Sequence, residues 1–63
     1  IRLQSTSLIR SYQILNMEGQ IVKEGEVNEK YGRLNVADLQ NGSYLLQLMT
    51  KAGMETQKIM ITK

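Results

Sequence analysis

Short stretches of this chain alternate between apolar and polar residues, which is the pattern of strands with one buried face. From Arg10 to Leu15, Tyr12 and Ile14 fall on one face of such a strand. Ser11 and Gln13 fall on the opposite, more polar face. The alternation therefore predicts a half-buried strand over this stretch.

The stretch from Tyr44 to Thr50 is the strongest predicted strand, because both of its faces are largely apolar. One face carries Tyr44, Leu46 and Leu48, and the other carries Leu45, Gln47 and Met49. A strand that is apolar on both faces belongs in the middle of a sheet or against a partner. A returning strand is expected from Met54 to Ile61. Its inward face would carry Ile59 and Ile61, whereas Lys58 and Met60 would point the other way.

Glycines separate the predicted strands. They are Gly19, Gly25, Gly32, Gly42 and Gly53. Asn16-Met17-Glu18-Gly19 has Asn where a type I turn favours a side-chain acceptor and Gly where a left-handed residue is needed, which predicts a hairpin with a bulge. The return strand would run from Gln20 to Val27. Lys51-Ala52-Gly53 repeats this turn chemistry, and Asn41-Gly42 suits positive φ.

Two further features concern the residues around the first hairpin. Gly25 stands between Glu24 and Glu26, and a glycine inside a strand often marks a bulge or a bend, so we expect local distortion there. Near the start, Ile1–Gln4 predicts another strand, and the small polar run Ser5-Thr6-Ser7 follows it.

The middle of the chain is more polar. Asn28–Gly32 predicts a loop, and Arg33–Val36 predicts a short strand with Leu34 and Val36 pointing inward. Ala37-Asp38-Leu39 predicts a brief turn. Several short strands at close spacing are typical of an all-β sandwich or barrel.

The concentration of Val, Ile, Thr and Tyr in the candidate strands, together with the recurring glycines, argues against helices. We therefore predict one all-β domain over residues 1–63, built from consecutive antiparallel hairpins. A chain of this length buries only about 60% of its unfolded surface, so the core should be thin.

Composition narrows the classes of function. The chain has no Cys and no His, which excludes disulfides and argues against a zinc site. The net charge is +2, but basic and acidic residues are mixed along the chain, and of the three aromatics, Tyr12, Tyr31 and Tyr44, two point inward. Nucleic-acid binding is therefore not expected. No apolar run approaches the ~20 residues that cross a bilayer, so we expect no direct membrane insertion.

No group of residues predicts catalysis. The serine hydroxyls lack an imidazole base, and Glu24 and Glu26 are most simply two solvated carboxylates on one strand face, although paired carboxylates can cleave glycosides. Asn41-Gly42-Ser43 matches the N-glycosylation acceptor pattern, but a hairpin turn explains the same residues. We expect no enzyme and no metal or cofactor site.

The hairpin residues match the pattern of a known protein family in their order and spacing, over about Ser11 to Lys63. The residues are Tyr12, Ile14, Asn16, Gly19, Val22, Leu39, Gly42, Tyr44, Leu46, Leu48, Gly53 and Lys58–Lys63. Together they resemble the C-terminal sorting domain of the type IX (Por) secretion system of Bacteroidetes. Gln40 stands where this family often has Pro, and its N-terminal Pro-Asn-Pro-like segment does not appear. The second departure predicts that the chain begins inside the domain, with the first strand absent or supplied by a neighbour.

The resemblance implies an immunoglobulin-like β-sandwich at the C-terminus of a cargo protein. Such a domain is recognised by the type IX secretion machinery after the cargo reaches the periplasm and takes the cargo across the outer membrane. A sortase-like peptidase then removes it, and the cargo stays at the cell surface or is secreted. The family motif positions, which are the candidate recognition residues, are Gly19, Gly42, Tyr44, Lys58, Ile59, Ile61 and Lys63. Turn geometry and packing also explain the glycines and Tyr44, whereas a core has little use for Lys58 and Lys63.

Two other functions fit an all-β domain. One is an adhesion or carbohydrate-binding module of an extracellular protein, with Tyr31 as the one plausible exposed aromatic for sugar stacking. The other is a structural spacer. In each case a thin core with an absent strand predicts a homodimer, formed by edge-strand pairing or strand exchange.

Overall fold

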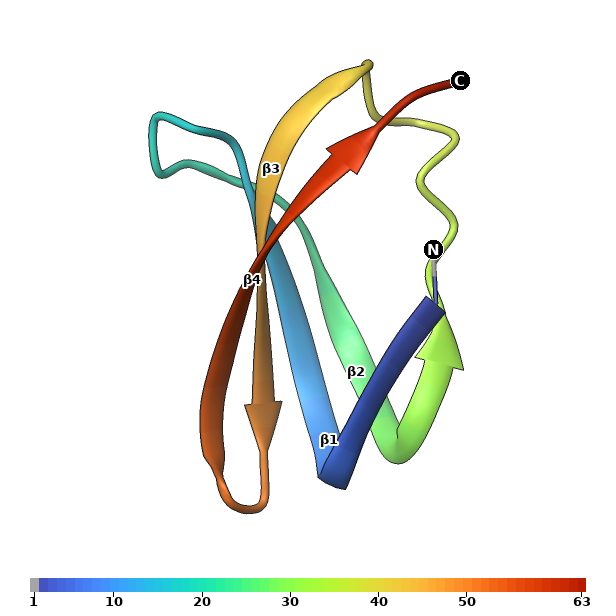
Figure 1. Cartoon of the computed structure of the whole chain (residues 1–63), viewed down its shortest axis with the longest axis vertical. Coiled ribbons are helices and arrows are strands. Elements are labelled where there is room, and N and C mark those ends of the chain that lie inside the picture. The colour runs from blue at the N-terminus through green and yellow to red at the C-terminus, as the bar shows by residue number, and fades with distance from the viewer. Residues whose placement is uncertain (1) are drawn as a thin grey trace.

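Four antiparallel strands form one sheet in the computed structural model, which describes residues 2–63 (Figure 1). The strands are β1 (Arg2–Leu15), β2 (Ile21–Arg33), β3 (Gly42–Thr50) and β4 (Gly53–Ile61). Their order across the sheet is β2-β1-β3-β4, so the pairing of β1 with β3 joins two consecutive hairpins. Residues 2–63 contain no helix, and so none that could cross a membrane. The predicted all-β antiparallel fold is confirmed.

β3 is a central strand, as its apolar pattern predicts, because it pairs with β1 on one side and β4 on the other. Tyr44, Leu46 and Leu48 are buried on one of its faces. β1 is the second central strand, and its Tyr12 and Ile14 are buried on the same side of the sheet. These two strands supply seven of the ten buried core residues.

The turn between β1 and β2 has the predicted chemistry. Gly19 has a φ of 89°, and its N–H donates to the Asn16 carbonyl oxygen at 3.0 Å. The Asn16 Oδ1 accepts the N–H groups of Glu18 at 3.0 Å and Gln20 at 2.9 Å. The pairing shifts by one residue next to the turn, which is the predicted bulge.

β1 and β2 are both longer than predicted. Ser5-Thr6-Ser7 lies inside β1, and the predicted loop Asn28–Gly32 lies inside β2. Arg2 pairs with Arg33, so the ladder continues beyond both polar segments. Cross-strand pairing and burial decide strand formation here, because β-propensity is weak and depends on context. Ile1, the first residue of the predicted N-terminal strand, lies outside the described residues.

The two long strands bend at the same place. Residues 5–8 of β1 lie opposite one residue of β2, Lys30, and a further shift follows near Asn28, which has a positive φ of 58°. Bulges bend a strand and increase its twist. Figure 1 shows the result: residues 2–4 and 31–33, which we call the flap, leave the plane of the remaining sheet.

Gly25 does not distort β2, so that prediction is wrong. The pairing with β1 is regular from Lys23 to Glu26, and Gly25 lies opposite Tyr12. A Cβ added to Gly25 would lie 2.9 Å from Cε1 of Tyr12. The glycine therefore leaves room for the buried tyrosine ring.

A connecting segment, residues 34–41, crosses from β2 to β3, and we call it the crossover loop. The short strand predicted for Arg33–Val36 does not form, because β2 ends at Arg33. Leu34 is buried and Val36 packs against the core, so their inward direction is confirmed. The predicted turn at 37–39 is also present.

The β3–β4 turn is tighter than predicted. Thr50 pairs with Gly53 and the register does not shift, so the loop has two residues and no bulge. The Thr50 hydroxyl donates to the Gly53 carbonyl oxygen at 2.7 Å and accepts the Ala52 N–H at 3.2 Å. The Thr50 side chain thus forms hydrogen bonds to the backbone of this turn, as the Asn16 side chain does in the β1–β2 turn.

β4 has the predicted two-faced pattern at its C-terminal end. Ile61 is buried and Ile59 packs against the core. Lys58 and Met60 are exposed on the opposite face.

One cluster forms the core of the molecule. Its buried members are Leu3, Ile9, Tyr12, Ile14, Leu34, Leu39, Tyr44, Leu46, Leu48 and Ile61. They come from the main sheet, the flap and the crossover loop, so a single bent sheet and its loop enclose the core in a sandwich-like arrangement. An immunoglobulin-like topology stays a prediction.

Candidate functional site

Six of the seven candidate recognition residues lie together at one end of the β3–β4 hairpin. They are Gly42, Tyr44, Lys58, Ile59, Ile61 and Lys63. Gly42 pairs with Ile61, and Tyr44 pairs with Ile59. Lys63 follows β4 by two residues. The antiparallel register of the hairpin therefore brings the G-x-Y residues and the chain end side by side.

Three of these six residues, Tyr44, Ile59 and Ile61, have side chains that face the core. Tyr44 is 9% exposed and Ile61 is 4% exposed, and Ile59 packs against the core cluster. The Tyr44 hydroxyl donates to the Gln40 carbonyl oxygen at 2.7 Å. These contacts hold the end of the hairpin to the crossover loop and leave little of the three side chains for a partner.

Lys63 binds the crossover loop, a role that the sequence did not predict. Its ammonium donates to the Ala37 carbonyl oxygen at 2.7 Å and to the Leu39 carbonyl oxygen. Its backbone N–H donates to the Asn41 Oδ1 at 3.0 Å. The lysine thus ties the residues after β4 to the loop that precedes β3. No local pattern could have shown this, because the acceptors are backbone carbonyls more than 20 residues away.

A second cation holds the same loop from the other edge of the sheet. The Lys23 ammonium on β2 lies 3.3 Å from both carboxylate oxygens of Asp38. A hydrogen bond from the backbone at Asp38, followed by the hydrogen bond from Lys23, lowers the pKa of this carboxyl below its ordinary 3.8. The loop is therefore fixed by one lysine at each edge of the sheet.

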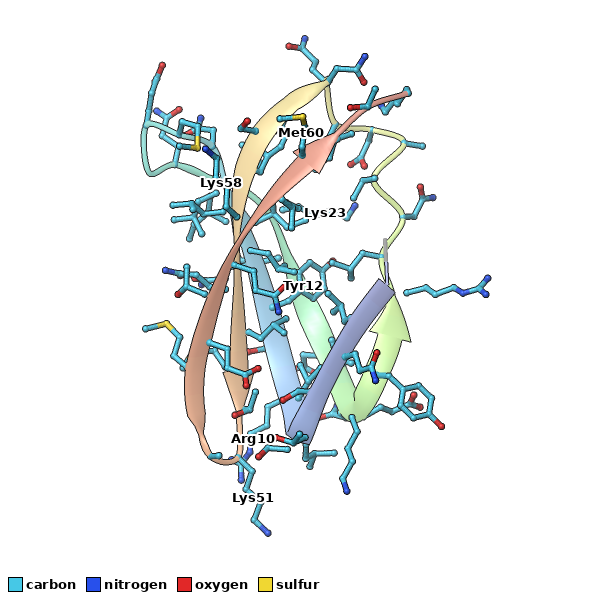
Figure 2. The ribbon with its side chains drawn as sticks, viewed as in Figure 1. Arg10, Tyr12, Lys23, Lys51, Lys58 and Met60 are labelled. Atoms are coloured by element: carbon cyan, nitrogen blue, oxygen red, sulfur yellow. The ribbon has the colours of Figure 1, made fainter. Side chains whose placement is uncertain are left out.

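Lys58 and Met60 are the exposed side chains of the same strand end, and Figure 2 shows both along the last part of β4. Lys58 pairs with Leu45 on β3, which pairs with Leu15 on β1. Leu15 in turn pairs with Ile21 on β2. We call Ile21, Leu15, Leu45 and Lys58 the outer row, because they cross the sheet on the face opposite the core. The sequence indicated part of this row, because the second face of β3 was predicted to be largely apolar and carries Leu45.

Gly19 lies in the β1–β2 turn and not with the other candidates. Glycine is favoured there by the positive φ and not by lack of space, because no atom lies within 4 Å of an added Cβ. Met17 in the same turn is 57% exposed. Gly19 is therefore placed to shape a turn.

Other kinds of site have little support in the structure. Among the described residues, no group of three or more His, Cys, Asp or Glu side chains could hold a metal ion. Glu24 and Glu26 lie on the exposed face of β2. Tyr31, the aromatic considered for sugar stacking, is 68% exposed and lines a shallow hollow with Gln4 and Arg33.

Comparison with known families matches residues 1–62 to the secretion system C-terminal sorting domain. No curated protein and no solved structure matches the chain. The family match extends over both hairpins and reaches further than the resemblance over Ser11–Lys63. It is a family of secretion signals and gives no support to an adhesion or carbohydrate-binding module. The chain therefore belongs to the C-terminal sorting domains of the type IX secretion system.

Proposed function

We propose that the secretion machinery reads this sorting domain on the outer face of β4, with Lys58 and Met60 as its direct contacts. As a type IX sorting signal, the domain directs the protein that carries it across the outer membrane to the cell surface or the medium. A signal must be accessible, and Met60 is 71% exposed whereas Ile61 beside it is 4% exposed. This difference within one strand end is the observation that carries the proposal.

The chemistry of this face suits contact with another protein. Methionine adapts its shape to irregular apolar surfaces, and a lysine can lay its apolar stem on such a surface while its ammonium pairs with an acid. The outer row extends the apolar area from Lys58 across Leu45 to Ile21, which is 51% exposed. A partner that covers β4 could bury this row as well.

The other candidate recognition residues support this face in our proposal without touching the partner. Gly42, Tyr44, Ile59 and Ile61 hold β4 against the core, and Lys63 holds its end to the crossover loop. Gly19 shapes the first turn. Substitution of any of them would impair export through loss of structure, which a measurement of folding detects.

The test fuses residues 1–63 to a periplasmic reporter in a strain with a working type IX system. We expect Lys58→Glu to lower export about tenfold, because charge reversal inside an interface costs at least ~1.4 kcal/mol. Arg33→Glu is the matched control, since it makes the same charge change on the opposite edge strand, β2. Circular dichroism of both purified variants should show the folded spectrum.

Two results would contradict the proposal at different levels. Equal export of the Lys58→Glu and Arg33→Glu fusions would mean that the outer face of β4 is not read. Export of the wild-type fusion no better than that of the reporter alone would mean that these 63 residues are not a sufficient signal.

We further propose that the cargo passes through the periplasm and that a sortase-like peptidase then removes the domain. The family assignment and the resemblance support this order of events. Mass spectrometry of the exported reporter should find it without residues 1–63. Exported reporter that still carries the intact domain would contradict the cleavage step.

We also propose that the domain forms a homodimer through β4. Of the two edge strands, β2 is bulged and has Asn28 at positive φ, whereas β4 pairs regularly over nine residues. A long regular edge is open to pairing with another strand. Light scattering at millimolar concentration should give twice the 7.2 kDa of one chain, and a 7.2 kDa species alone would exclude the dimer.

A further inference from the structure

Three cations without an ion partner gather at the end of the molecule that carries the β3–β4 turn. They are Arg10, Lys30 and Lys51, and no described carboxylate lies within ion-pair distance of them. Figure 2 shows Arg10 and Lys51 at this end, away from Lys58 and Met60. Ile9 pairs with Thr50, and Arg10 and Lys51 follow these two residues in opposite directions, so both lie near the Ile9–Thr50 pair.

A shallow hollow of about 460 Å³ lies beside two of these cations, Lys30 and Lys51. Lys30 and Lys51 line it together with Thr6, Ser7 and Leu8. The Lys51 N–H donates to the Leu8 carbonyl oxygen at 2.9 Å, which fixes the β3–β4 turn to the bend of β1. Two ammonium groups and two hydroxyl groups are hydrogen-bond donors, and phosphate oxygens are strong acceptors of charge-assisted bonds.

Backbone irregularities converge on the same hollow. Residues 5–8 bulge from β1 opposite Lys30, and Arg10 is an extra residue in the pairing of β1 with β3. Asn28, two residues before Lys30, has a φ of 58°, which is uncommon for a residue other than glycine. Bulges re-aim side chains and are frequent beside functional sites. The regular pairing of β3 with β4 shows no such irregularity.

We propose that this hollow binds a phosphate group, held by the ammonium groups of Lys30 and Lys51 and the hydroxyls of Thr6 and Ser7. Arg10, which does not line the hollow, adds electrostatic attraction from the same end of the molecule. The phosphate belongs either to a lipid headgroup at a membrane surface or to a small soluble molecule. Leu8 is 37% exposed between the cations and would meet the apolar part of a lipid. Glu29, the nearest acid in sequence to Lys30, lines a different hollow with Arg33. The proposal does not depend on recognition at β4.

The first arm of the test follows backbone amide NMR signals of the chain during titration with inorganic phosphate, against sodium chloride at equal ionic strength. We expect saturable shifts at Thr6, Ser7 and Lys51 with a Kd on the order of millimolar. Lys51→Gln should weaken binding about fivefold or more, whereas Lys58→Gln makes the same charge change elsewhere and should leave the Kd unchanged. Absence of saturable shifts, or equal weakening in both variants, would overturn the proposal.

The second arm identifies the source of the phosphate. It measures flotation of the chain with vesicles of phosphatidylcholine alone and with added phosphatidylglycerol. A lipid headgroup is supported if the chain binds the anionic vesicles, Lys51→Gln abolishes this binding and Lys58→Gln preserves it. A soluble ligand is supported if the chain binds phosphate but does not float with the vesicles. Flotation reduced equally by both substitutions is general charge attraction and counts against the site. Reporter export is measured separately, so failure here leaves the sorting proposal standing.

Discussion

Gly25 is a residue at which the lack of a side chain determines packing. Its Cα hydrogen faces the ring of Tyr12, which is 8% exposed, and an added Cβ would approach Cε1 to 2.9 Å. Because the ring is enclosed, it can move only by disturbing the core. We predict that Gly25→Ala lowers the free energy of unfolding by ~1–3 kcal/mol, as overpacking does elsewhere.

Gly32 on the same strand provides the control for this prediction. A Cβ added there meets only Val27 Cγ1 at 3.4 Å, which is close to ordinary contact. Gly32→Ala should change the free energy of unfolding by no more than ~0.5 kcal/mol. Urea unfolding of both variants by circular dichroism measures the difference, and equal effects would show that Tyr12 yields easily.

Asp38 gives a prediction about pH at the same scale. Its pKa is below 3.8 in the folded chain, so the carboxylate form stabilises the fold above this pH. That stabilisation is lost as the pH falls through the lowered folded-state pKa. Tm measured between about pH 7 and pH 2 should therefore fall less for Asp38→Asn than for the wild type. Parallel curves for the two proteins would show that the Lys23–Asp38 contact does not contribute.

At the scale of elements, the C-terminal end of β4 depends on a residue outside the strand. Lys63→Met keeps the apolar stem but removes the bonds to the Ala37 and Leu39 carbonyl oxygens. We predict faster amide hydrogen exchange at Ile61 and Leu39, and a loss of ~1 kcal/mol in stability. Lys58→Met is the control, because no hydrogen bond of that side chain occurs among the described residues. Unchanged exchange in Lys63→Met would mean that the backbone bond to Asn41 suffices.

The elements that the sequence predicts well are those with local causes. The turn at Asn16–Gly19 forms because its own side chain and backbone satisfy it, and β3 forms because both of its faces are apolar. The polar segment 28–32 was predicted to be a loop and the polar run Ser5–Ser7 was assigned to no strand, yet they lie in β2 and β1. Their conformation depends on a partner strand that local composition does not reveal.

The same distinction applies to the candidate site. The alternation in β4 correctly placed Ile59 inward and Lys58 outward, since a strand has a period of two. The role of Lys63 could not be predicted, because it depends on where the crossover loop passes. The distortion predicted at Gly25 does not occur, and the need for glycine there could not be predicted, because the Tyr12 ring that it accommodates comes from another strand.

At the scale of the whole molecule, the two ends differ in character. One end joins the chain terminus, the crossover loop and the apolar outer row, and it carries the proposed contact with the secretion machinery. The other end gathers Arg10, Lys30 and Lys51, which have no ion partner among residues 2–63, around bulged strands. The core packs between the two ends and supports both of them. Each functional test of a variant therefore needs a separate measurement of folding.

The thinness of this core leads to the last prediction. Stability of ~0.05–0.15 kcal/mol per residue gives this chain ~3–9 kcal/mol, and truncation of a fully buried leucine costs ~3–5 kcal/mol. Leu48 is 0% exposed, whereas its neighbour Met49 on the other face of β3 is 43% exposed. Leu48→Ala should therefore lower Tm by at least ~12 °C or abolish cooperative unfolding, and Met49→Ala should shift it by less than ~4 °C. Thermal unfolding by circular dichroism distinguishes these outcomes. Similar shifts would mean that a partner or second copy covers the outer face and that both faces of β3 are interior in solution.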